Sequence, residues 1–186
     1  MSDGGIGHDA NLLRRVGGGD HRAMRELVER ALPRLLPLAQ RMLGDRGEAE
    51  DVVQETFVRA WRQASHWQPG AARIETWLYR IALNLCHDRL RGRNRPQDNA
   101  EDEWIDPAPL PDAQAEQAQR GERIAQALAA LPSRQREALV LQFYQGLSNV
   151  ESAELMDISV DALESLLARA RRNLRRLLAD ADGEPR

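Results

Sequence analysis

The stretch that decides the fold is residues 75–95, ETWLYRIALNLCHDRLRGRNR. Its apolar residues at positions 78, 81, 82, 85 and 86 recur at helical spacing, which predicts one packing face. Polar residues recur on the opposite face: Arg80, Asn84, Asp88 and Arg91. We therefore expect the apolar side of this helix to pack in the core and the polar side to be exposed to solvent or a partner.

The two ends of this helix carry aromatic and basic side chains. Trp77 and Tyr79 lie at its start, and arginines at 89, 91, 93 and 95 precede Pro96. Aromatic rings beside guanidinium groups can stack on unpaired bases and neutralise phosphates. An amphipathic core helix with a solvated basic end explains the same pattern.

The composition favours an intracellular helical protein. All 26 basic residues among the 186 are arginines, and the 29 acidic residues leave a net charge of −3, which argues against a uniformly basic nucleic-acid coat. Ala, Leu, Arg, Glu and Gln dominate over Val and Ile, so helix is favoured over strand. Neither a signal peptide nor a membrane-spanning stretch is evident, and we expect a soluble, cytoplasmic protein without membrane insertion.

The motifs of common enzyme and metal sites are missing from the sequence. A single cysteine, Cys86, allows no internal disulfide, and its place on the apolar face favours a core residue over a redox sensor. The sequence has no phosphate loop, zinc-ligand spacing or nucleophile elbow. We predict no enzyme, no catalytic residue, no metal and no cofactor.

The first half of the chain reads as a helical bundle. Residues 1–8 are expected to be disordered within a flexible arm, 1–19, that includes a short helix at 9–16. A long helix at 21–43 is expected to bend or split at Pro33 and Pro37. Helix 48–64 and a loop at 65–74 follow, and the helix has this predicted apolar stripe: Val53, Phe57, Ala60, Trp61 and Ala64.

Residues 97–119 are acidic and rich in proline, without a basic residue, and predict an extended flexible linker. The chain is therefore expected to be all-α, with an N-terminal helical bundle at 20–96, this linker, a helix-turn-helix domain at 120–180 and a tail at 181–186.

The second domain is expected to contain four helices. They cover 120–131, 134–145, 148–156 and 160–179, and the second would bury Ala138, Leu139, Leu141 and Phe143. A tight turn at Asp157 joins the last two helices, the second of which is rich in arginine, as in a helix-turn-helix. An ordinary two-helix hairpin with a solvated basic face is the alternative.

Two motifs resemble a known family. Residues 49–61, AEDVVQETFVRAW, followed by residues 77–84, WLYRIALN, are similar to the extracytoplasmic-function (ECF) branch of the bacterial sigma-70 family. The resemblance covers 20–95 and 120–178, with both motifs in the family's order ahead of the helix-turn-helix. It implies a promoter-specificity subunit that binds core RNA polymerase and promoter DNA.

The resemblance assigns roles to surface residues of the first domain. Helix 48–64 would dock on the polymerase through Asp51, Gln54, Glu55 and Arg62. The loop 65–75 and the polar face of the next helix would capture the −10 element as single-stranded DNA. The candidates for that contact are Trp67, Arg80, Asn84, Arg91, Arg93 and Arg95.

The second domain would read the −35 element as duplex through the start of its last helix. The candidates are Asp161, Glu164, Ser165, Arg169, Arg171 and Arg172. The sequence departs from the family pattern here, with Ala162, Glu164 and Leu166 at the start of the helix and Asp157 in place of the usual glycine of the turn.

The resemblance also implies an anti-sigma factor as a partner and a linker that threads a nucleic-acid channel, although a solvated tether would look the same. Two other functions fit the residues alone. One is a helix-turn-helix regulator that acts without docking on polymerase, and the other is a helical adaptor without a role on DNA.

Overall fold

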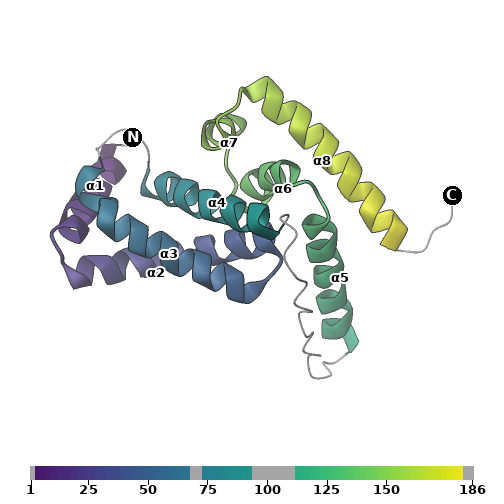
Figure 1. Cartoon of the computed structure of the whole chain (residues 1–186), viewed down its shortest axis with the longest axis horizontal. Coiled ribbons are helices and arrows are strands. Elements are labelled where there is room, and N and C mark those ends of the chain that lie inside the picture. The colour runs from purple at the N-terminus through teal and green to yellow at the C-terminus, as the bar shows by residue number, and fades with distance from the viewer. Residues whose placement is uncertain (1–2, 68–72, 94–111, 182–186) are drawn as a thin grey trace.

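The structure is a computed structural model that describes residues 3–67, 73–93 and 112–181. Within these ranges every regular element is a helix (Figure 1). The N-terminal bundle contains α1 (Asp3–Gly17), α2 (His21–Leu43), α3 (Arg46–Gln63), a 3-10 turn η1 (Ala64–His66) and α4 (Ile74–Arg93). The C-terminal bundle contains α5 (Asp112–Ala129), α6 (Ser133–Leu139), a π-helical turn η2 (Val140–Tyr144), α7 (Asn149–Met156) and α8 (Val160–Ala181). The predicted all-α fold with two helical domains is confirmed.

Helix α2 is the centre of the N-terminal bundle. It begins at Asp20, whose carboxylate accepts from the backbone N–H of Arg22 at 2.8 Å and of Ala23 at 3.2 Å, and it ends at Gly44, which is left-handed with φ of 76°. Pro33 and Pro37 lie inside it, yet it runs as one helix rather than two. Its apolar face packs against both α3 and α4. Side chains such as Leu27, Leu35, Leu38 and Met42 are fully buried there.

The N-terminal helix is longer and better packed than the sequence predicted. Helix α1 begins at Asp3, and Leu12, Leu13 and Val16 are 1% exposed. The carboxylate of Asp9 is bonded by the guanidinium of Arg30 at 2.8 Å, which joins α1 to α2. Residues 9–17 therefore form part of the core instead of a flexible arm.

Helix α3 buries four of the five residues of its predicted apolar stripe, Trp61 being the exception. Val52 and Thr56 are fully buried beside Val53, Phe57 and Ala60, whereas Trp61 is 45% exposed. The buried face is rotated toward Val52 and Thr56, which places the Trp61 indole on the flank of the helix. There it lies edge-on to His21, with ring centroids 6.0 Å apart.

The predicted helix 134–145 changes its geometry midway. Helix α6 passes into the π-helical turn, in which the N–H of Gln145 donates to the carbonyl of Val140 at 3.1 Å. The wider turn rotates the residues that follow it. Phe143 therefore points outward and is 59% exposed, which corrects its predicted burial.

Much of the predicted linker, 97–119, lies outside the described residues. Helix α5 nevertheless begins at Asp112, earlier than the predicted start near Arg120. The buried apolar residues of α5, α6, α7 and α8 join those of the N-terminal bundle in one continuous cluster. The two bundles are thus in contact, as Figure 1 shows where α6 and α7 lie beside α4.

Helices α7 and α8 form the helix-turn-helix. Ser148 and Glu151 make a capping box at the start of α7, where the Ser148 hydroxyl accepts from the Glu151 N–H at 3.2 Å. Asp157 ends α7 in the left-handed region with φ of 54°. The Ser159 hydroxyl then accepts from the N–H of Ala162 at 3.2 Å, which starts α8.

The left-handed turn at Asp157 predicts how substitutions there affect stability. Asp157→Gly should unfold at the same or higher urea concentration than the parent, because glycine adopts positive φ without strain. Asp157→Val should lower the free energy of unfolding by about 1–2 kcal/mol, because a branched side chain is strained there. Urea titrations followed by circular dichroism measure both. Equal stability of the two variants would contradict the role of this conformation.

Candidate nucleic-acid interface

The polar face of α4 is exposed as the sequence predicted. Arg80, Asn84, Asp88 and Arg91 are all exposed. The opposite face is buried against α2 and α3 through these residues: Leu78, Ala82, Leu85 and Cys86. The guanidinium of Arg91 pairs with Asp88 one turn before it. Because the buried side fixes the rotation of the helix, the guanidinium and amide groups of this face have a defined direction.

The other candidates for contact with single-stranded DNA differ in how accessible their side chains are. Trp67 is partly buried and packs against the core, so only part of its indole can meet a base. Arg93 turns back onto the bundle, where it donates to the Leu43 carbonyl at 2.9 Å and pairs with Glu48 at 2.8 Å. Arg95 lies outside the described residues. Arg80 and Asn84 are therefore the best-placed members of this set.

Tyr79 packs inside the protein, although the sequence analysis grouped it with Trp77 among the aromatic rings that could stack on bases. It is 2% exposed, and its hydroxyl donates to the side-chain carbonyl of Gln145 at 2.9 Å. Burial raises the pKa of Tyr79. Its spacing from Ala82 and Cys86 places it beside the buried stripe, a signal that was already present in the sequence.

The candidate docking residues share one surface of α3. Asp51, Gln54 and Arg62 are exposed, and Glu55 is partly exposed. A hydrogen bond from Arg59, 2.8 Å long, lowers the pKa of the Glu55 carboxyl. This surface of α3 thus presents the carboxylates of Asp51 and Glu55 and the amide of Gln54, together with the positive charge of Arg62.

The start of α8 brings together the candidate duplex contacts. Five residues of the predicted set are exposed along one side: Asp161, Glu164, Ser165, Arg169 and Arg172. Arg171 is also exposed but lies over the ring of Phe143, with its guanidinium carbon 5.4 Å from the centroid. Glu164 accepts from the amide of Asn149 at 3.2 Å.

The sequence reading missed two polar residues beside this surface. Asn149 at the start of α7 bonds both Glu164 of α8 and the amide of Gln142, the latter at 2.6 Å. Gln142 also accepts from Arg171 at 3.3 Å. This chain of amides holds α7, α8 and the π-helical turn in one orientation. These hydrogen bonds form only in the tertiary fold, so no local sequence pattern predicts them.

The single thiol is packed away from these surfaces. Cys86 is fully buried, and burial raises its pKa to about 12. This agrees with the core role predicted for it. Among the described residues, no group of three His, Cys, Asp or Glu side chains converges as a metal site, and no helix is long and apolar enough to cross a membrane.

Comparison with known proteins identifies the class. The model of Sigma-70 region 2 matches residues 27–96, and that of Sigma-70, region 4 matches 121–174. The first matched segment contains α3 and α4, and the second contains the helix-turn-helix.

Whole-chain relatives agree with these matches. The ECF RNA polymerase sigma factor SigE of Mycolicibacterium smegmatis is 36% identical over 89% of this chain and 66% of its own length. SigW of Bacillus subtilis, also an ECF RNA polymerase sigma factor, is 30% identical over 90% of this chain and 95% of its own. The sigma factor RpoE of Bartonella quintana, solved in complex with the anti-sigma factor NepR, has a TM-score of 0.66 and 25% identity over 83% of this chain and 95% of that one.

The chain therefore belongs to the ECF branch of the sigma-70 family. It is a sigma factor for promoter-specific transcription, and such factors are initiation factors without enzymatic activity.

The burial of Cys86 predicts its reactivity. In the native protein at mildly alkaline pH the thiol should not react with a thiol-specific chromogenic reagent, because it is both shielded and protonated. In denaturing urea one thiol per chain should react at once. Rapid reaction of one thiol in the native protein would show that this part of α4 opens to solvent.

Proposed function

We propose that this sigma factor binds core RNA polymerase through α3 and captures the single-stranded −10 element on the exposed face of α4. The observation that carries the proposal is the division of the N-terminal bundle into two different polar surfaces. The α3 surface presents carboxylates, an amide and one arginine, whereas the α4 face presents guanidinium and amide groups. One small bundle can therefore hold polymerase and melted DNA together.

The chemistry of the α4 face suits strand capture. Removing a base from the stack costs a few kcal/mol, and stacking on an aromatic ring returns about 1–3 kcal/mol per base. Asn84 offers both a donor and an acceptor to a base edge, and Arg80 offers a guanidinium to a base or phosphate. The partly exposed indole of Trp77 lies in the first turn of the same helix, and that of Trp67 follows the 3-10 turn η1.

We also propose that α8 binds the −35 element as duplex DNA. The exposed residues Asp161, Glu164 and Ser165 lie in its first turns, where a recognition helix meets base edges. Arg169 and Arg172 follow and would contact phosphates. The carboxylates of Asp161 and Glu164 can accept from the exocyclic amine of cytosine, which favours C·G pairs in that part of the site.

The partners and location follow from the same proposal. The factor would act in the cytoplasm, where bacterial polymerase and DNA are found. An anti-sigma factor is a further expected partner, supported by the structure of RpoE with NepR.

The decisive experiment is transcription in vitro with purified core polymerase and a library of genomic promoters. Initiation at specific sites only when this chain is present would support the proposal. A helix-turn-helix regulator or adaptor would neither bind core in a pull-down nor start transcription with it. The absence of initiation at every promoter would overturn the proposal.

The α4 face can be tested with Arg80→Ala combined with Asn84→Ala. Promoter opening, followed by permanganate reactivity of unpaired thymines, should fall by roughly tenfold or more because two polar contacts to the strand are lost. Affinity for core polymerase should stay unchanged. Arg25→Ala, which removes a charge from an exposed position of α2, is the matched control. Equal loss of opening and core binding would refute the separation of the two surfaces.

The α3 surface can be tested with Gln54→Ala combined with Glu55→Ala. We expect affinity for core polymerase to fall by roughly tenfold, because a few residues of an interface carry most of its binding energy. A competition assay with a labelled reference sigma factor measures the change. Gln63→Ala, an exposed position on another side of α3, should compete like the parent. Unchanged competition by the double variant would reassign the docking surface.

A further inference from the structure

The groups proposed for strand capture belong to two different segments of the N-terminal bundle. Trp67 directly follows the η1 turn, where its N–H donates to the carbonyl of Ala64 at 3.3 Å. Arg80 and Asn84 lie on α4, which begins at Ile74. A strand that meets both segments needs them at a fixed separation, because a binding group displaced by about 1 Å loses much of its effect. The position of η1 relative to the start of α4 is therefore important for strand capture.

The end of α1 is in close contact with η1. A Cβ at Gly17, the last residue of α1, would lie 2.9 Å from the backbone nitrogen of Ser65 and 3.1 Å from its Cα. Any side chain at Gly17 would therefore displace the Ser65 backbone, and only glycine allows this approach. Leu13 and Val16, in the last turns of α1, are 1% exposed and fix the helix in the core. The end of α1 thus determines where η1 lies, and with it the Trp67 that follows.

A buried carboxylate in the middle of α1 contacts the start of α4. Asp9 is 5% exposed, and its Oδ2 accepts from the backbone N–H of Ile74 at 3.4 Å. This N–H is the first of α4 and has no acceptor within the helix. Asp9 therefore acts on α4 as an N-cap side chain would, although it lies 65 positions earlier in the chain. Its negative charge also suits the positive end of the helix dipole.

Arg30 of α2 connects the same carboxylate to α4. Its Nη1 donates to Asp9 at 2.8 Å, and its Nε donates to Glu75, in the first turn of α4, at 2.9 Å. A planar guanidinium can bond two carboxylates at once through separate N–H groups. One side chain therefore joins α1, α2 and the start of α4.

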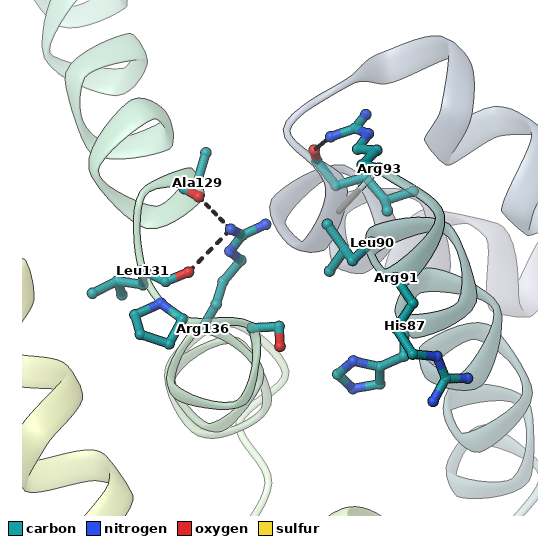
Figure 2. Close-up of a pocket in the computed structure, with 10 residues that line it drawn as sticks. His87, Leu90, Arg91, Arg93, Ala129, Leu131 and Arg136 are labelled. Atoms are coloured by element: carbon teal, nitrogen blue, oxygen red, sulfur yellow. Dashed lines mark hydrogen bonds between the residues drawn. The ribbon is translucent and has the colours of Figure 1, made fainter. Parts of the chain in front are cut away.

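The other end of α4 is held without any contact from α1. Arg93 in its last turn donates to the carbonyl of Leu43 at 2.9 Å, as Figure 2 shows. Figure 1 shows α1 at the opposite end of the bundle, where α3 ends and α4 begins. A change in α1 is therefore expected to move η1 and the start of α4, and to leave the rest of α4 in place.

We propose that α1 is a positioning element for strand capture. Gly17 fixes η1 and Trp67, while Asp9, together with Arg30, fixes the start of α4. These three residues act through Trp67 and the α4 face, so they are positioning residues that do not themselves contact DNA. The inference rests on the proposed role of Trp67 and the α4 face in binding the −10 element. It gives α1 a part in promoter opening in addition to its part in the core.

Gly17→Ala is the sharpest test, because the next residue supplies a matched control. A Cβ at Gly18 would lie 3.4 Å from the carbonyl oxygen of Arg14 and 3.5 Å from that of Arg15, which are ordinary van der Waals distances. Gly18→Ala therefore makes the same chemical change without displacing η1. Alanine also favours helix more than glycine does, so a weaker α1 would not explain a defect of Gly17→Ala.

The measurement uses the full-length proteins assembled with core polymerase. Each holoenzyme is titrated with a fluorescein-labelled single strand that carries the −10 element of a promoter found in the library experiment. Gly17→Ala should bind this strand about tenfold more weakly than the parent, because the displaced η1 moves Trp67. Gly18→Ala should bind like the parent. Affinity for core polymerase and helicity by circular dichroism should be equal for all three, which separates positioning from loss of folded structure.

The contact of Asp9 with α4 is tested by two further variants. Asp9→Asn keeps a side-chain oxygen that can accept from the Ile74 N–H, whereas Asp9→Ala removes it. We expect strand affinity to fall by about threefold for Asp9→Asn and about tenfold for Asp9→Ala, with core affinity unchanged. This partial rescue by the conservative variant is the result that a positioning hydrogen bond predicts. If circular dichroism shows that Asp9→Ala is unfolded, Asp9→Asn and the two glycine variants still decide the question.

Two results would overturn the proposal. Gly17→Ala and Gly18→Ala could bind the strand equally well, or the loss of strand affinity in Gly17→Ala could be matched by an equal loss of core affinity. The parent holoenzyme distinguishes this failure from that of the proposed function. If the parent itself does not bind the strand, strand capture by the N-terminal bundle is refuted. If the parent binds and the variants match it, only the role of α1 is refuted.

Discussion

The burial of one side of α4 against α2 and α3 is the constraint on which the rest of the structure depends. Leu78, Ala82 and Cys86 are fully buried there, and a buried leucine alone contributes about 1.5–3 kcal/mol. Since these residues leave no freedom for the helix to rotate, Arg80 and Asn84 must face away from α2 and α3. The same packing places Tyr79 where its hydroxyl can reach the second bundle. This one packed interface therefore determines where the guanidinium of Arg80 and the amide of Asn84 lie and that both are exposed.

Local sequence patterns predicted the parts of the fold that depend on local physics. Helical periodicity identified both faces of α4. The helix starts at Asp20, Ser148 and Ser159 follow the same local physics, because a short polar side chain there bonds the free N–H groups. Asp157 was recognised as a turn residue because aspartate tolerates the left-handed conformation that the structure shows. The family resemblance added the order of the two functional surfaces.

The remaining features depend on contacts between distant residues. The π-helical turn that exposes Phe143 leaves no signature in the apolar spacing, so a regular helix was the natural expectation. Trp61 was placed in the core because its spacing fits, but the buried face of α3 extends toward Val52 and Thr56 and leaves Trp61 at its edge. The contact between the partly exposed His87 and the buried Glu137 joins residues fifty positions apart, and nothing in the sequence around either one marks them as partners. Sequence reasoning therefore identified the candidate surfaces but not the contacts between the two bundles.

The single buried cysteine has a practical consequence. Because Cys86 lies in the core and the rest of the chain has no other thiol, a cysteine introduced on the surface of either bundle would be the only readily accessible one. Paired fluorescent dyes or spin labels could then be attached at chosen places without replacing a core residue. The separation of the two bundles could be followed in real time as polymerase and promoter are added.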